Sequence, residues 1–143
     1  MNEMAAFTDC PDCLCQASRS AARSVTNVFD RHLRPHGLRV TQFTILANLI
    51  LRGATPVTAL AEALGMDRTT LTRNLSLLEQ NGWAETRNDE NDARTHLVSA
   101  TAKGRAAAND ALPAWREAQD SVAAMLGGAD VAALRRLANA KLT

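Results

Sequence analysis

The chain has 143 residues, enough for one domain with a buried core and too few for two of ordinary size. Its residues are 46% hydrophobic but only 3% aromatic, with no Tyr, which favours helices packed through small and branched side chains. The net charge of +1 makes overall charge uninformative, so nucleic-acid binding has to be argued from where the charges lie. No apolar run is long enough to span a membrane and no secretion signal is evident, so we expect a cytoplasmic protein with free thiols.

Two helices are predicted in the first part of the chain. Apolar residues repeat at helical spacing within residues 12–33, and Pro35 and Gly37 end that helix. A second helix is predicted over residues 41–52, followed by a short connection or edge strand at 54–56. The predicted buried positions of the two helices are Val25, Val28, Phe29, His32, Leu33, Phe43, Leu46, Ala47 and Ile50.

A helix-turn-helix pattern follows. Its first helix covers residues 58–64 and is closed by Gly65, and its second covers residues 68–80 with Asp67 as the N-cap. The second helix has an inward Leu face formed by Leu71, Leu75 and Leu78, and its opposite face carries Arg68, Thr69, Thr72, Arg73 and Ser76. Threonine and arginine side chains suit thymine methyls, phosphates and guanine edges, although an ordinary solvated helix face has a similar composition.

Two short strands around a polar tip come next, a pattern typical of a β-wing. The strands are predicted at residues 83–87 and 95–100, and the connection at 88–94 is too polar and too turn-prone to be core. Arg94 at this tip is placed to enter a DNA minor groove, where the negative potential attracts arginine. Asp92 either pairs with Arg94 or is simply a turn residue.

The charge of the predicted DNA-binding part indicates that one copy of the chain is not enough for tight DNA binding. Residues 68–96 contain four arginines and five acidic residues, so a single copy would bind DNA weakly. Two copies on a two-fold-related site would double the number of phosphate contacts.

Two more helices are predicted at the C-terminal end. Thr101 caps a helix that runs to about Leu126 and that Pro113 should kink, and Asp130 caps a last, short helix. The predicted apolar faces consist of Leu112, Trp115, Gln119, Val122 and Leu126 in the longer helix and Val131, Leu134, Leu137 and Ala138 in the shorter one. A terminal helix this short cannot bury its apolar face alone, so it either packs within one chain or, with the first helix, forms a two-fold dimer interface.

Three cysteines, Cys10, Cys13 and Cys15, lie together where the first helix begins. Cys10 and Cys13 are close enough for a bridge if the turn between them is helical, and a thiolate is favoured in the first turn of a helix. The thiols are therefore idle, or sense oxidants, or bind a soft metal ion, or pair between chains. A closed zinc site within one chain lacks a fourth ligand, so we expect no metal and no cofactor.

No arrangement of residues typical of an enzyme is present. The sequence has no phosphate-binding loop, no Ser/His/Asp arrangement and no metal triad. Cys10 and Cys13 have the spacing of a thiol oxidoreductase, but no βαβ pattern follows them. The remaining alternative to DNA binding is a winged-helix module that binds proteins, which strong salt dependence of DNA binding would exclude.

Several sequence pieces, in a fixed order and spacing, carry a family resemblance. They are QFTIL (42–46), LAEALGMDRTTLTRNLSLLEQNGW (60–83), Arg87, DAR (92–94) and TAKG (101–104). With these pieces, residues 17–143 resemble the MarR family of bacterial winged-helix regulators. The resemblance implies a mainly α fold with a small β-wing, in which a winged helix-turn-helix is flanked by dimerisation helices.

The resemblance also implies a domain plan and a function. Residues 1–143 would form one domain, with dimerisation helices at 12–34 and 102–143 and the winged helix-turn-helix at 41–100. The chain would be a DNA-binding transcriptional regulator, a homodimeric repressor on a pseudo-palindromic operator, released by a small effector or by thiol oxidation. By position, the implied helix contacts are Thr69, Thr70 and Arg73, the wing-tip residue is Arg94, and the residues that shape or anchor the wing are Arg87 and Asp92.

The sequence departs from the family pattern in a few places. Arg39 stands where a small polar cap is usual, so we expect the capping box with Gln42 to be missing. Ala93 stands where a second wing arginine is frequent. The hydroperoxide-sensing branch of the family is similar in carrying Leu-Cys-x-Ala near the start of its first helix, here Leu14-Cys15-Gln16-Ala17, but it also relies on tyrosines that this chain lacks.

A small effector would instead bind between the dimerisation helices and the winged domain. The polar and aromatic candidates on those helices are Arg19, Arg23, His32 and Trp115. Of these, we expect His32 and Trp115 to be core residues rather than ligand contacts.

Overall fold

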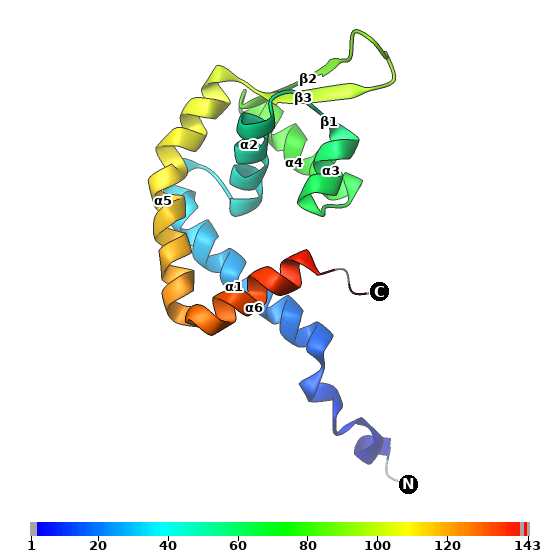
Figure 1. The fold of residues 1–143 in the computed structure, drawn as a ribbon, viewed down its shortest axis with the longest axis vertical. Helices are drawn as coiled ribbons and strands as arrows, with labels where there is room; N and C mark the ends of the chain where they lie inside the picture. The colour runs from blue at the N-terminus through cyan, green and yellow to red at the C-terminus, as the bar shows by residue number, and fades with distance from the viewer. Residues whose placement is uncertain (1–2, 141, 143) are drawn as a thin grey trace.

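A computed structural model describes residues 3–140 and residue 142 of the chain. Its α-helices are α1 (Leu14–Leu33), α2 (Val40–Arg52), α3 (Val57–Leu64), α4 (Arg68–Gln80), α5 (Ala102–Leu126) and α6 (Gly128–Asn139) (Figure 1). Its strands are β1 (Thr55–Pro56), β2 (Ala84–Asn88) and β3 (His96–Ala100), and short 3-10 turns lie at Glu3–Phe7, Cys10–Asp12 and Arg34–His36. The predicted fold class, mainly α with a small β-wing, is confirmed. None of the described helices is long and apolar enough to cross a membrane.

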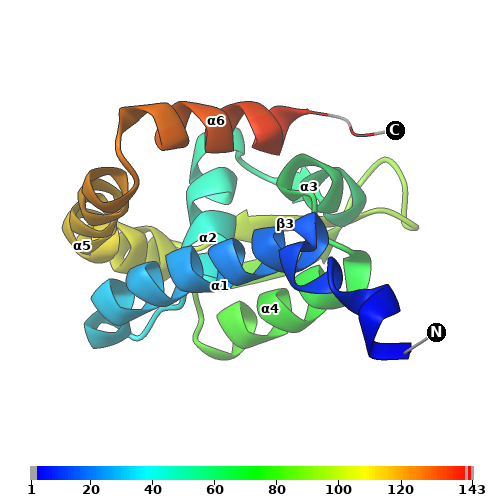
Figure 2. The same cartoon turned by 90° about the horizontal axis from the view of Figure 1, so that it is seen from below.

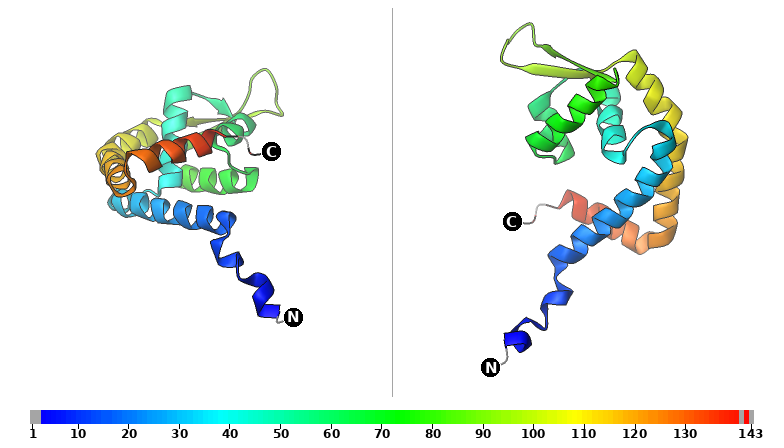
Figure 3. Two further views of the ribbon diagram at one scale, coloured as in Figure 1. Left: turned by 60° about the horizontal axis from the view of Figure 1, so that its bottom comes forward. Right: turned by 180° about the vertical axis from the view of Figure 1, so that it is seen from behind.

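The first helix starts two residues later than predicted, because the Cys10–Asp12 turn precedes it. Its C-terminal half is buried through Val28, Phe29 and Leu33, as predicted. Its N-terminal half is exposed almost throughout, and together with the preceding turns it projects away from the rest of the molecule (Figure 3).

Helix α2 is buried on more than the one face that its sequence predicted. Its buried residues are Gln42, Phe43, Ile45, Leu46 and Leu49. The predicted positions Ala47 and Ile50 are only half-buried. The reason is that α1, α4, α5 and β3 all pack against this helix, so it has neighbours around most of its circumference.

The sheet is antiparallel, with strand order β1-β3-β2. The edge-strand alternative for residues 54–56 is the one observed, since Thr55 pairs with Val98. In the wing, Ala84 lies opposite Ala100 and Asn88 lies opposite His96. This register buries Val98 and Ala100 on the domain side while the polar tip extends beyond the body of the domain (Figure 1).

Trp115 joins two buried clusters. The larger cluster is centred on the winged helix-turn-helix and also takes in Leu33 of α1 and Ala108 and Ala111 of α5. The smaller one, formed by Val28, Phe29, Ala118 and Val122, joins α1 to α5. The Trp115 ring stacks on Phe43 with a centroid distance of 5.9 Å and lies tilted against Phe29 at 6.2 Å. Trp115 is therefore a core residue, as predicted, and it connects the helices of the two regions.

The buried face of α5 differs from the prediction. Of the expected positions only Val122 is buried, and the other buried residues are the small ones Gly104, Ala108, Ala111 and Ala118. At Gly104 the backbone of Trp83 approaches α5 too closely for a side chain, and at the alanine positions a hydrophobicity pattern ranks alanine below leucine and tryptophan. The helix runs without a break through Pro113 and bows along its length (Figure 1).

The prediction that Asp130 caps the last helix is wrong. Helix α6 begins at Gly128 with Gly127 as its N-cap, and Asp130 lies inside the first turn. Both α1 and α6 extend from the α5 side of the molecule in the same general direction (Figure 2). No residue of α6 is buried among the described residues. Of the predicted domain of residues 1–143, residues 1–2, 141 and 143 lie outside the described residues.

We predict that Gly104→Ala destabilises the fold. A Cβ at this position would lie 2.0 Å from the backbone oxygen of Trp83, and backbone cannot move aside as a flexible side chain can. The expected cost is about 1–3 kcal/mol of unfolding free energy, measured by urea denaturation. The matched control is Gly128→Ala, which meets nothing within 4 Å and should leave stability unchanged or slightly raised. Equal stabilities for the two variants would contradict the assigned contact.

Candidate DNA-binding surface

Helix α4 begins at a fully formed N-cap. Asp67 Oδ1 accepts from the Thr70 N–H at 2.8 Å, and Asp67 Oδ2 accepts from the Thr70 hydroxyl at 2.8 Å. These bonds lower the pKa of Asp67, chiefly through the Thr70 backbone N–H and next through its hydroxyl. The predicted cap is confirmed, and the hydroxyl of Thr70, a predicted DNA contact, is bonded to it.

The exposed face of α4 carries the polar residues that the sequence placed there. Leu71, Leu75 and Leu78 are buried, as predicted. On the other side, a shallow open hollow is lined by Arg68, Thr69, Thr72 and Arg73. Two guanidinium groups and two hydroxyl-bearing side chains are thus grouped on one solvent-facing side of the helix. They are exposed there and available to contact a DNA groove.

The wing tip is closed by its own hydrogen bonds. The Asp89 N–H donates to the Thr95 carbonyl at 2.9 Å, and the Thr95 N–H donates to the Asp92 carbonyl at 3.0 Å. Asp92 Oδ1 accepts from the Arg94 N–H at 3.0 Å. The same oxygen lies 3.7 Å from Arg94 Nε, with the two side chains 51% and 96% exposed. Asp92 therefore shapes the turn and also pairs with Arg94, but a pair this exposed stabilises little and leaves Arg94 available.

A contact that sequence analysis missed joins α4 to the wing. The Thr86 hydroxyl of β2 donates to a carboxylate oxygen of Glu79 in the last turn of α4. The two residues are seven positions apart, so the bond adds a polar link between the helix and the hairpin. Arg87 follows Thr86 on β2, opposite Leu97, and its side chain is exposed. Neither local periodicity nor a motif could have revealed the Glu79–Thr86 bond.

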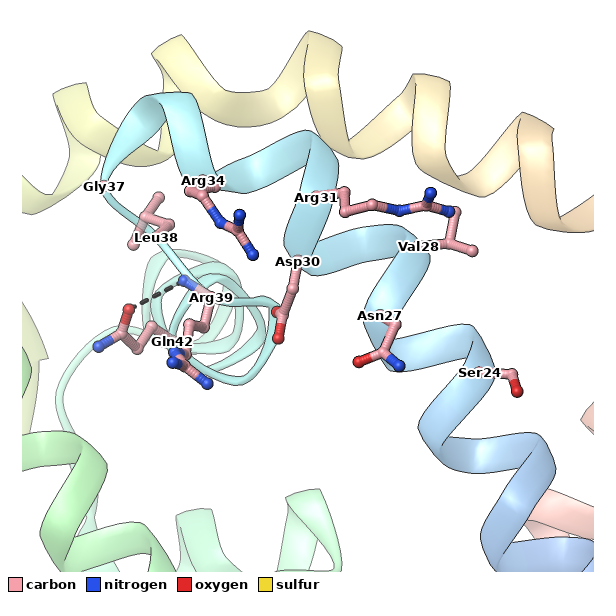
Figure 4. Close-up of a pocket in the computed structure, with 10 residues that line it drawn as sticks. All are labelled: Ser24, Asn27, Val28, Asp30, Arg31, Arg34, Gly37, Leu38, Arg39 and Gln42. Atoms are coloured by element: carbon pink, nitrogen blue, oxygen red, sulfur yellow. Dashed lines mark hydrogen bonds between the residues drawn. The ribbon is translucent and has the colours of Figure 1, made fainter.

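The start of α2 differs from the prediction that its capping box is missing. Gln42 Oε1 accepts from the Arg39 N–H at 3.0 Å, so one half of the box forms (Figure 4). A cap that the Arg39 side chain cannot provide comes from α1 instead, where Asp30 Oδ1 accepts from the Val40 N–H at 2.8 Å. The expectation that the box would be missing was therefore wrong for its Gln42 half, which forms although the Arg39 side chain makes no cap hydrogen bond.

A large cleft lies between α1 and the start of α2, and we call it the α1–α2 cleft. It has a volume of about 1010 Å³, and Arg31, Arg34 and Arg39 line it together with Asp30 (Figure 4). The predicted effector residues Arg19 and Arg23 do not line it. His32 is half-buried rather than part of the core, and its Nδ1 donates to the Val28 carbonyl at 2.9 Å.

The three cysteines lie at the start of α1, as predicted. Cys10 opens a 3-10 turn, Cys13 is the N-cap of α1 and Cys15 lies in its first turn. All three are free and exposed. The Cys13 N–H donates to the Cys10 carbonyl at 3.2 Å, so the turn between them has the helical form that a bridge would need. Within residues 3–140 and 142, no three His, Cys, Asp or Glu side chains are grouped to hold a metal ion.

Comparisons with known proteins agree with this architecture. A model of the MarR family matches residues 36–95. The crystal structure of the transcriptional regulator MosR of M. tuberculosis in complex with DNA is similar, with 40% sequence identity, a TM-score of 0.76, and coverage of 88% of this chain and 96% of that one. The chain belongs to the MarR family. No curated protein matches it by sequence.

Other solved structures share the fold. A probable transcriptional regulator from Pseudomonas aeruginosa is 28% identical with a TM-score of 0.79, covering 89% of this chain and 95% of that one. A mutant MarR of E. coli complexed with operator DNA has a TM-score of 0.80 at 23% identity, covering 92% and 94% of the two chains. This MarR-family chain is therefore a DNA-binding transcriptional regulator and not an enzyme. The alternative of a protein-binding module without DNA binding is not supported.

We predict that the Asp67 cap contributes stability that acid removes. Because the pKa of Asp67 is lowered in the folded protein, this stability is present above the ordinary value of 3.8 and is lost as pH falls through the lower folded value. Asp67→Ala should unfold at lower urea than the wild type at pH 7, and the difference should shrink as pH falls below 3.8. Asp120→Ala, an exposed acid of α5, is the control and should show neither effect. A pH-independent difference for Asp67→Ala would contradict the role of its charge.

Proposed function

We propose that this MarR-family regulator acts as a homodimeric repressor in the cytoplasm, with one α4 in each half of a pseudo-palindromic operator. The observation that carries this proposal is the grouping of Arg68, Thr69, Thr72 and Arg73 on the outward side of α4, beside a wing that presents Arg94. This arrangement fits a helix in the major groove and a wing arginine in the adjacent minor groove.

The proposed contacts divide by role. Arg73 and Thr69 contact base edges, while Arg68 and Thr72 contact the edges or the adjoining phosphates. Thr70 supports the start of the helix through Asp67 and leaves its methyl group for DNA. Arg94 enters the minor groove, Asp92 holds its turn, and Arg87 stabilises the wing and contacts phosphate.

The dimer proposal rests on exposed apolar surface as well as on charge. Leu14 of α1 is 85% exposed, Met125 of α5 is 65% exposed, and Leu134 and Leu137 of α6 are 46% and 56% exposed. Exposed apolar side chains on three helices outside the DNA-binding part are available to an interface. We propose that residues 12–34 and 102–143 form the dimer interface and that residues 41–100 form the DNA-binding part. A two-fold dimer also supplies the second set of contacts that the acidic wing requires.

Two routes of regulation are proposed. Oxidation of the exposed thiols at the start of α1 would alter a helix of the dimer interface. Alternatively, an anionic effector would bind in the α1–α2 cleft. Three arginines line this cleft, and its one carboxylate already accepts a hydrogen bond from the Val40 N–H. Either event would change how the two DNA-binding parts are spaced.

Selection of duplexes from a random pool tests the DNA-binding proposal. We expect recovered sites with two inverted half-sites whose centres lie about 10–10.5 bp apart or a multiple of that spacing. Arg73→Ala should weaken binding by about 1–3 kcal/mol and relax base preference at one position. Arg94→Ala should weaken binding and lower the slope of affinity against salt by about 1. Arg52→Ala, an exposed residue of α2 outside the proposed contact set and the proposed dimer interface, is the control. Unpaired sites, or equal binding by all variants, would count against the proposal.

Oxidation tests the regulatory proposal on a selected duplex. We expect mild hydroperoxide to lower the affinity of the wild type by at least about tenfold, ~1.4 kcal/mol, and a thiol reductant to restore it. A variant with Cys10, Cys13 and Cys15 all replaced by Ser should bind equally before and after treatment. If the wild type is indifferent to oxidation, thiol control is wrong and the α1–α2 cleft remains as the regulatory site.

A further inference from the structure

A small pocket lies between α4 and the wing, and we call it the α4–wing pocket. It is lined from three separate parts of the chain, namely residues 56–58 at the start of α3, Arg68 as the first residue of α4, and residues 94–96 at the end of the wing turn. The structure thus brings Arg68 and Arg94, which are 26 positions apart in the sequence, to one cavity. Neither Thr58 nor His96 belongs to the DNA-contact set that the sequence predicted.

The charges around this pocket favour an anion. Arg68 and Arg94 each present a guanidinium group, and His96 offers a ring N–H donor. Of the described residues that line the pocket, none carries a carboxylate. Of the nearby acids, Asp67 bonds to Thr70, and Asp92 forms only an exposed pair with Arg94, 3.7 Å from its Nε, with which an anion can compete. Negative oxygens would therefore find donors here without an opposing charge in the pocket.

The remaining wall supplies uncharged donors. Within the described residues, no side chain caps the start of α3, where Pro56 is the N-cap. The hydroxyl of Thr58 belongs to this wall and is exposed. A hydroxyl beside the positive end of a helix adds to the attraction that the two arginines provide.

The size of the pocket limits its occupant. Its volume of about 120 Å³ corresponds to roughly four water molecules at ~30 Å³ each. This space accommodates a single phosphate group but not a nucleoside. The occupant is thus a small oxyanion or one group of a larger polyanion.

The position of the pocket identifies that polyanion. If α4 lies in the major groove and the wing reaches the minor groove, the sugar–phosphate backbone that separates the two grooves passes between Arg68 and Arg94. We propose that the α4–wing pocket binds one phosphodiester of the DNA backbone in each half-site, and that Thr58 and His96 are further phosphate-contacting residues. This inference rests on the proposed function and fixes the register of the protein along the DNA.

A scan of single neutral linkages tests the proposal. In a set of otherwise identical selected duplexes, each phosphate of one half-site is replaced in turn by an uncharged methylphosphonate. We expect wild-type affinity to fall about ten- to a hundredfold at one phosphate between the two contacted grooves, the range of a hydrogen bond to a charged group. The scan needs no substitution in the protein, so misfolding cannot produce or hide the result.

The double variant Thr58→Val, His96→Ala assigns that phosphate to the pocket. It should bind the unmodified duplex more weakly than the wild type, and the methylphosphonate at the sensitive position should cost it little more. The matched control is Thr8→Val, His36→Ala, which alters exposed residues outside both the pocket and the proposed dimer interface and should behave as the wild type. An undiminished penalty in the Thr58/His96 variant would overturn the assignment.

The two levels of the proposal fail in distinguishable ways. If the chain selects no duplex, the proposed function and the pocket assignment are both wrong. If it selects duplexes but no phosphate between the grooves is sensitive, only the pocket assignment is wrong.

Discussion

The close approach of Gly104 to the backbone of Trp83 is the constraint on which the arrangement of this regulator depends. The Thr101 hydroxyl accepts from the Gly104 N–H at 3.0 Å and donates to the Gly82 carbonyl at 2.6 Å, and the Thr101 N–H donates to the Trp83 carbonyl at 3.0 Å. One threonine therefore caps α5 and binds the turn that ends α4. Because the wing begins directly after Trp83, the DNA-facing elements and the long helix are joined at one rigid point.

Trp115 provides a second connection between the same two regions. It stacks on Phe43 of α2 and contacts Phe29 of α1, so the core of the winged helix-turn-helix is continuous with the packing of α1 on α5. A change in the position of α1 would therefore act on α2 through packed aromatic rings. Asp30, which caps α2 from α1, adds a polar link to the same pair of helices.

The parts of the fold that the sequence predicted well are those made by local contacts. Asp67, the leucine face of α4 and the strands of the wing depend on residues within a few positions of each other. The Asp30–Val40 and Glu79–Thr86 bonds were not predictable in this way, because each joins two elements whose mutual position only the tertiary structure sets.

Errors of prediction have physical reasons of the same kind. The buried face of α5 consists of Gly104, where the Trp83 backbone leaves no room for a side chain, and of alanines, whereas the amphipathic pattern pointed to larger residues. At α6, the glycine pair begins the helix earlier than the side-chain cap at Asp130 suggested. In the candidate site, α4 and the wing residues were recognisable as motifs, but the meeting of Arg68, Arg94, Thr58 and His96 in one pocket was not.

The hydrogen bonds that close the wing tip have a consequence for the entropy of binding. Ordering a free loop costs about 1–2 kcal/mol for each residue whose backbone is fixed. Here the backbone between Asp89 and Thr95 is already held by bonds within the turn, including those to the Asp89 and Asp92 carboxylates. In the proposed complex, insertion of Arg94 would then cost only the immobilisation of one long side chain, about 0.5–1.5 kcal/mol. A wing with few basic residues can thus contribute affinity because little of its interaction energy is spent on folding the tip.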